Sequence, residues 1–195
     1  SGRPIPLKEE DPFLLRSRIP EIGLLSVEYA RHVPVTAGAK TVNVRVRGVE
    51  PEFGEIRNIH PQAGGRFLNP LDLAEKRRVV FLGEELARDL FGTEDVVGRT
   101  VQINRSTFLV VGVARKKVQM GMYNGADRSQ ATIPAPTFKS MYTDARIENL
   151  VYVPASPAVG DAAKAGFYRV MGAKHHFDPE DERALGMWDT REMQR

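Results

Sequence analysis

Two adjacent histidines followed by acidic residues are the part of this sequence that most resembles a chemical site. His175 and His176 lie in the stretch AKHHFDPEDERALGMWDT, residues 173–190. Neighbouring side chains point to opposite faces of a strand and diverge by about 100° on a helix, so this pair cannot easily bind one metal ion. We therefore expect an exposed pair of histidines that ends a helix, where the negative end of the helix dipole favours positive charge.

A metal-dependent hydrolase is the alternative that these histidines leave open. It would use His175, His176 and Asp178, and it would need His32 or His60 to approach from a distant part of the chain. The zinc-binding spacings HExxH and Hx3–5H are missing. Metal analysis of the untagged protein decides this alternative.

Other catalytic arrangements find no support in the sequence. There is no GxSxG nucleophile elbow, and a chain without cysteine can form neither a Cys-His pair nor a disulfide. The adjacent acids Glu84 and Glu85 precede an apolar helical pattern, where carboxylates complement the positive end of the helix dipole. We expect no catalytic residue, no metal site and no cofactor.

The least regular stretch of the chain is residues 116–130, which contains Met120, Met122, Tyr123 and Asn124. Methionine is flexible and polarisable, and it is frequent both at adaptable binding surfaces and in cores. An irregular stretch of this length is typical of a functional loop. We predict these four residues to be a contact loop for a partner or substrate, and burial in the core is the alternative.

Composition and charge indicate a folded domain without a face for nucleic acid. The chain has 195 residues, 42% of them hydrophobic, and a net charge of +3, which suits one domain or two small ones. Basic residues alternate with acids, and no basic stripe is interleaved with aromatic residues, so no nucleic-acid partner is expected. The absence of cysteine is compatible with the cytoplasm and with the bacterial periplasm.

Membrane and targeting signals are also missing. The longest strongly apolar run, residues 108–114, is far shorter than the roughly 20 residues that cross a bilayer. No signal peptide is recognisable. Ser1 and Gly2 resemble what a protease leaves after cutting off a purification tag, in which case the natural chain could continue beyond both ends.

Hydrophobic periodicity predicts a mixture of strands and helices. A hairpin of residues 24–35 and 41–49 has valines on one face and Arg45 and Arg47 on a solvent-exposed face. Further strands are predicted over residues 79–82, 100–103, 107–113, 131–133 and 147–153. Helices are predicted over residues 12–18 with Asp11 as N-cap, 84–91, 136–142 and 157–171 with Gly172 as its end, and a helical turn over 51–58.

One stretch is more specific than these patterns: LFGTEDVVGRTVQI, residues 90–103, followed by FLVVGV, residues 108–113. It resembles the pattern LFGxxD[PV]VG[KR]x[IV]x[IV], then FxV[IV]GV, of the extracytoplasmic core domain of MacB-like ABC transporter permeases, the MacB/FtsX superfamily. The motif residues are Leu90, Phe91, Gly92, Asp95, Gly98 and Arg99. Flanking features follow in the same order, so the resemblance spans roughly residues 20–190.

The motif positions have structural roles. Asp95 can close a turn through its own backbone, and Gly98 supplies a turn position that a Cβ would crowd. Leu90 and Phe91 cover the core at the end of a helix. None of the six supplies a nucleophile or a metal site, so the resemblance implies a domain that is not an enzyme.

The fold that the resemblance implies is α+β with two subdomains. A discontinuous porter-like α/β subdomain comprises residues 1–48 and 146–195, and a strand-rich, Sabre-like subdomain of residues 49–145 is inserted in it. In such a domain residues 185–188 form the last strand before the chain returns to the membrane, with the histidines exposed beside it.

The function that the resemblance implies is mechanical. The domain would lie in the periplasm as part of a bacterial inner membrane permease, and it would couple ATP hydrolysis by an ABC ATPase to efflux. Its partners would be the ATPase, the transmembrane helices, a second permease protomer and, in some systems, an adaptor protein of the membrane fusion type. Alternatives are a lipoprotein-handling or signalling member of the superfamily, or a free-standing periplasmic binding module.

Overall fold

The computed structural model of the chain describes residues 7–117, 125–175 and 187–189. Its strands are β1 (Ile22–Ala37), β2 (Lys40–Val49), β3 (Val79–Leu82), β4 (Thr100–Ile103), β5 (Ser106–Val113), β6 (Ala131–Pro134), β7 (Asn149–Pro154) and β8 (Met187–Asp189). Its helices are α1 (Asp11–Arg18), α2 (Glu52–Ile56), α3 (Pro70–Ala74), α4 (Glu84–Phe91), α5 (Gly125–Arg128), α6 (Ala135–Met141) and α7 (Gly160–His175), which the 3-10 turn η1 (Pro157–Val159) precedes. The predicted α+β class is confirmed.

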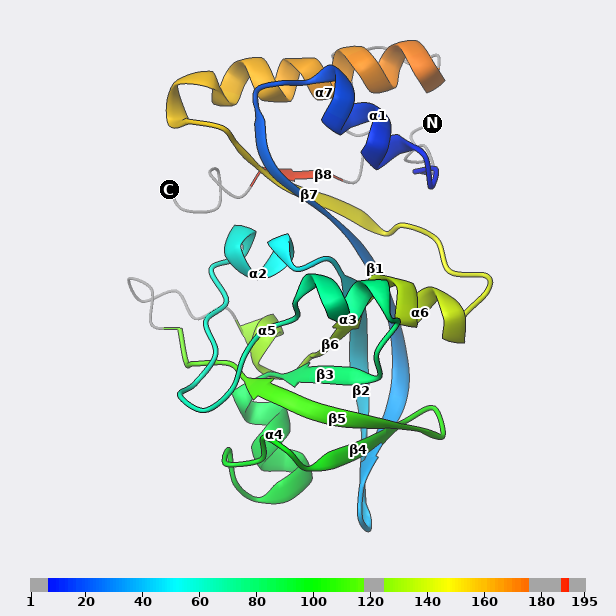
Figure 1. Ribbon diagram of the computed structural model, residues 1–195, viewed down its shortest axis with the longest axis vertical. Helices are drawn as coiled ribbons and strands as arrows, with labels where there is room; N and C mark the ends of the chain where they lie inside the picture. Colours follow the sequence, from blue (N-terminus) through cyan, green and yellow to red (C-terminus); the bar gives the residue numbers. More distant parts are fainter. Residues whose placement is uncertain (1–6, 118–124, 176–186, 190–195) are drawn as a thin grey trace.

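The centre of the molecule is a closed circuit of six strands, which we call the ring. β1 pairs with β2, and the pairing continues through β6, β3, β5 and β4 back to β1. The β2–β6 and β3–β5 pairs are parallel, whereas the other pairs in the ring are antiparallel. The ring fills the lower half of Figure 1, and the tip of the β1–β2 hairpin extends beyond it.

Strand β1 belongs to two parts of the sheet. Residues 22–28 pair with β7, and residues 28–37 pair with β2. β8 adds in parallel to β7, and α1 and α7 lie together at the same end of the molecule, at the top of Figure 1. One continuous strand therefore joins this end, which we call the helical end, to the ring. The division into residues 1–48 with 146–195 and an inserted 49–145 stays a prediction.

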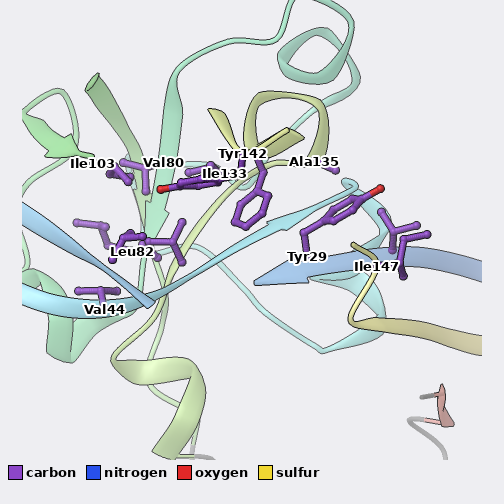
Figure 2. Packing of buried hydrophobic residues seen from close by; sticks show 14 of the residues in the cluster. Tyr29, Val44, Val80, Leu82, Ile103, Ile133, Ala135, Tyr142 and Ile147 are labelled. Atoms are coloured by element: carbon purple, nitrogen blue, oxygen red, sulfur yellow. The ribbon is translucent and has the colours of Figure 1, made fainter. Parts of the chain in front are cut away.

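Alternation along the strands builds the core. In β4, Val101 and Ile103 are buried, whereas Thr100 and Gln102 are exposed, as the sequence predicts. The larger cluster of buried residues fills the ring and continues to the helical end. Figure 2 shows part of this cluster, including Val44, Leu82 and Ile133. The smaller cluster includes Phe53 and lies where α2 packs on the sheet. Most of the buried apolar area therefore holds the ring and the helical end in one structure.

Local sequence explains most of the element boundaries. All four residues of β3 are buried, and α4 ends at Gly92, whose φ of +74° is the left-handed conformation that glycine accepts. The turn between β4 and β5 holds Asn104 and Arg105, both at positive φ, which matches the twist of a two-residue hairpin. These elements, and the predicted hairpin of β1 and β2, are confirmed with boundaries shifted by a few residues at most.

Two predictions about the helices need correction, and a helix with a capping box has no counterpart among the predictions. Helix α7 continues past Gly172 to His175, because a glycine inside a packed helix lowers its stability without ending it. Asp11 is the first residue of α1 and not its cap, and Glu10 stands at the cap position without a side-chain bond to the helix. Helix α3 was not predicted, although Asn69 and Asp72 form a capping box around Pro70.

Candidate functional site

The predicted contact loop is only partly described by the structure. Met120, Met122, Tyr123 and Asn124 lie outside the described residues. Both flanks of the loop are described, namely Lys117 on one side and helix α5 on the other. The flanks converge on a group of charged side chains, which we call the loop-base cluster: Arg47, Arg57, Lys117 and Asp127.

Asp127 is the centre of the loop-base cluster. Its Oδ1 lies 2.8 Å from Arg47 Nη1 and 3.4 Å from Arg57 Nη2, and its Oδ2 lies 3.7 Å from Lys117 Nζ. The exposed fractions of these side chains are 11% for Asp127 and 3%, 15% and 22% for the three cations in that order. One carboxylate with little access to water therefore faces three positive charges.

Strand pairing places Arg47 in this cluster. Arg47 of β2 is opposite Thr132 of β6, and its Nε donates to Thr132 Oγ1 at 2.8 Å. Its guanidinium also lies over the Phe53 ring of α2, 4.8 Å from the centroid, where a cation–π attraction adds to packing. The prediction that Arg47 faces water is therefore wrong, because the face of β2 that it occupies is covered.

The electrostatics of the cluster reflect burial and an excess of cations. Burial lowers the pKa of Arg47, although Asp127 counteracts this effect. Burial also lowers the pKa of Lys117, and the nearby charges of Arg57 and Arg47 repel its proton further. For Asp127 burial alone would raise the pKa, but the charges of Arg47 and Arg57 outweigh burial and hold the pKa below its ordinary value.

The return of the loop is fixed on the start of α4. Arg128 Nε donates to the buried carboxylate of Glu84 at 2.6 Å, and the N–H of Gly83 donates to Gln130 O at 2.9 Å. A Cβ on Gly83 would lie 2.1 Å from Arg128 O, so only glycine allows this approach. A cavity of about 20 Å³ adjoins both the ion pair of Arg128 with Glu84 and the loop-base cluster. Its lining includes Arg47, Glu84, Lys117, Asp127, Arg128 and Thr132.

The family-motif residues lie at the other end of α4. Leu90 is buried, and Phe91 packs on the core with the Arg99 guanidinium 4.4 Å from its ring centroid. The Asp95 N–H donates to Thr93 Oγ1 at 3.1 Å, within the turn. Gly98 has a φ of +91° with nothing within 4 Å of an added Cβ, so the predicted crowding is wrong and the reason for glycine is its backbone conformation.

The histidines are dispersed. His60 Nε2 lies 2.6 Å from Asn58 Oδ1, and His175 Nε2 lies 3.1 Å from Asp11 Oδ2. His175 is 10% exposed, so the prediction of an exposed pair is wrong for this residue, while His176 and Asp178 lie outside the described residues. Among the described residues, no group of three or more His, Asp or Glu side chains is placed to hold a metal ion.

Sequence reasoning missed the loop-base cluster and the Asp11 contact for the same reason. Each joins residues far apart in the chain, and a single sequence contains no signal of which charges meet. Arg47 stands directly before Gly48 and Val49, and only the structure shows that this end of β2 is fully buried.

The fold of the chain is that of the extracytoplasmic domains of ABC-type transporters. It is similar to the extracellular domain of the noncanonic ABC-type transporter YknZ from Gram-positive bacteria, with a TM-score of 0.74 at 15% identity over 91% of this chain and 88% of that one. It is also similar to the periplasmic region of MacB from Actinobacillus actinomycetemcomitans, with a TM-score of 0.69 at 20% identity over 88% and 75% of the two chains. At these identities the likeness shows the fold alone.

Sequence comparison gives the family. Residues 1–167 match the model of the MacB-like periplasmic core domain, and the chain belongs to this family. It is 28% identical over 163 residues to the macrolide export ATP-binding/permease protein MacB of Chlorobium luteolum and 29% identical over 142 residues to that of Bdellovibrio bacteriovorus. These matches cover 82% and 73% of this chain but only 24% and 21% of the relatives. The chain is thus a non-catalytic kind of domain from a transporter permease.

No described helix combines the length and the apolar character that crossing a membrane requires.

Proposed function

We propose that this domain transmits motion of an inner membrane permease to the periplasm and so couples cytoplasmic ATP hydrolysis to export. The observation that carries the proposal is the continuity of β1 from the helical end into the ring. Because β1 is paired with β7 over residues 22–28 and with β2 over residues 28–37, displacement of α1 and α7 would pass along one continuous strand to the ring.

Contacts at the helical end support this role. The Asp11 carboxylate of α1 accepts from Lys174 and His175 of α7 and is fully buried. Arg16 of α1 binds Glu50, which follows β2, and the Tyr29 hydroxyl donates to Glu9 at 2.8 Å. Two helices that are distant in the sequence are thus tied to each other and to the ring.

The partners follow from the relatives. Their name joins ATP binding and a permease in one protein, so we propose an ABC ATPase, the transmembrane helices of the permease and a second protomer as partners. In the efflux version of the proposal, the transporter would act together with a periplasmic adaptor protein and would export a macrolide-like substrate. A lipoprotein-handling or signalling transporter would use the same motion for a different purpose. A free-standing binding module would differ from all of these, because its full gene would encode no flanking apolar spans.

The proposal is tested by measuring movement in the full permease with its ATPase. The exposed hairpin residue Ala39 is replaced by cysteine, and a spin label is attached to it. This cysteine is the only one in the domain, because the sequence contains none. The expected result is a change in the distance between the labels of two protomers when ATP is trapped, and no change with an ATPase that cannot bind ATP. An unchanged distance in both states would overturn the proposed coupling.

A further inference from the structure

We propose that the cavity of the loop-base cluster binds a small inorganic anion of the size of chloride. This site is independent of the transport function proposed above. Its first basis is charge: Arg47, Arg57 and Lys117 approach the single carboxylate of Asp127. The adjoining residues 118–124, VQMGMYN, contain no acid that could balance them.

The neighbouring acids are held by other cations. Glu84 pairs with Arg128 at 2.6 Å, and Glu28 pairs with Arg45 at 3.5 Å. Arg128 and Arg45 each pair with a second acid as well, Glu85 and Glu148, and the charge of Glu28 also acts on Arg47. The cavity itself has a net positive lining, because the cations at its wall outnumber the acids: Arg47, Arg115, Lys117 and Arg128 against Glu84 and Asp127. Burying unbalanced charge is unfavourable, and a bound anion lowers that penalty whereas a water molecule leaves the net charge unchanged.

Arg47 provides the donor for such a ligand. Its Nε and Nη1 donate to Thr132 and Asp127, while Nη2 has no acceptor among the described residues. Arg47 lines the cavity and is 3% exposed. Lys117, whose Nζ also donates to Arg57 O, lines the same space, so two cationic side chains border the cavity. Burial is the main cause of the lowered pKa values of both residues, and repulsion between neighbouring cations contributes to each.

The size of the cavity selects the class of anion. Its volume of about 20 Å³ is small and suits a monatomic ion better than a polyatomic one. Sulfate and phosphate carry five heavy atoms and do not fit without moving the walls. A monatomic halide fits the space and supplies the missing negative charge.

Two measurements on the 195-residue chain test the proposal. Crystals grown in sodium bromide are expected to show an anomalous peak in the cavity, within contact distance of Arg47 Nη2 and Lys117 Nζ. Stability is also measured in sodium chloride and in sodium gluconate at equal ionic strength, so that general screening is the same in both. Chloride at ten times its Kd is expected to raise the folding equilibrium constant about 11-fold over gluconate.

Matched variants separate this site from other effects. Arg57→Gln removes one excess charge and is expected to weaken the response to chloride at least threefold, whereas Arg31→Gln, remote from the cluster and paired with Asp144, leaves it unchanged. Should Arg57→Gln not fold, Lys117→Gln takes its place. Equal stability of the wild-type chain in chloride and gluconate, or bromide only on the outer surface with water in the cavity, overturns the proposal.

Discussion

Arg16 Nη2 lies 3.0 Å from both carboxylate oxygens of Glu50, and this pair joins helix α1 to the residue that follows β2. Glu50 Oε1 also accepts from the Val27 N–H at 3.0 Å, while the Glu50 N–H donates to Ser26 Oγ at 3.1 Å. The bonds meet near Glu28, where β1 changes its partner from β7 to β2. Glu50 therefore links α1, β1 and the ring at their junction.

Replacing Glu50 by alanine is expected to loosen this junction. The Val27 N–H loses its acceptor and Arg16 loses its partner, and since Arg16 is 42% exposed we expect a loss of only about 1 to 2 kcal/mol in the free energy of unfolding. Urea unfolding measures the loss, and amide exchange should rise in α1. The control is Asp144→Asn, which breaks the exposed pair with Arg31 and should leave the urea midpoint unchanged. Equal effects of the two variants would contradict the role given to Glu50.

The excess of cations at the loop base predicts an asymmetry between substitutions. Asp127→Asn leaves three cations without their carboxylate and should cost about 3 kcal/mol of stability. Arg57→Gln removes repulsion together with one attraction, so its cost should stay below about 1 kcal/mol. Both are measured by urea unfolding at pH 7 in the same salt. Equal losses would show that the cluster behaves as a balanced network.

The lowered pKa of Asp127 predicts how stability depends on pH. Since the pKa of the folded state is below the ordinary value of 3.8, the carboxylate stabilises the fold above that pH, and this contribution is lost as pH falls through the folded-state pKa. The stability difference between the wild-type chain and Asp127→Asn should be constant above about pH 5 and shrink below pH 4. A difference that does not change between pH 6 and pH 3 would show that Asp127 is not held ionised.

The conformation of Gly98 predicts which residue can replace it. At a φ of +91° alanine is strained and should cost about 1 kcal/mol, whereas asparagine tolerates the left-handed region better and should recover part of that loss. Thermal unfolding of the two variants measures the difference. If crowding were the reason for glycine, asparagine, the larger residue, would be the worse replacement.

The sequence predicts this fold best where local rules decide. The alternation in β4, the apolar face of α4 and the stop at Gly92 depend on neighbours in the chain, and each was predicted correctly. Alternation along β2 predicts an exposed Arg47, and the position at a helix end predicts an exposed His175, but contacts from distant segments bury both. The resemblance to the family predicts the α+β class of the whole domain, but it does not locate any of the ion pairs between distant segments.

The contact between Asp11 and α7 predicts the effect of removing one buried charge. Asp11→Asn keeps a side-chain oxygen that can accept from the Lys8 N–H, but Lys174 and His175 lose the carboxylate between them. Because Asp11 is fully buried while Lys174 is 25% exposed, the loss in stability should be about 2 kcal/mol, below the roughly 3–5 kcal/mol that breaking a fully buried pair costs. Glu10→Gln is the control, since Glu10 reaches the same lysine from the surface and should leave the urea midpoint unchanged. Amide exchange should rise in both α1 and α7 of Asp11→Asn if the carboxylate holds the two helices together; a rise confined to α1 would mean that it acts on its own helix alone.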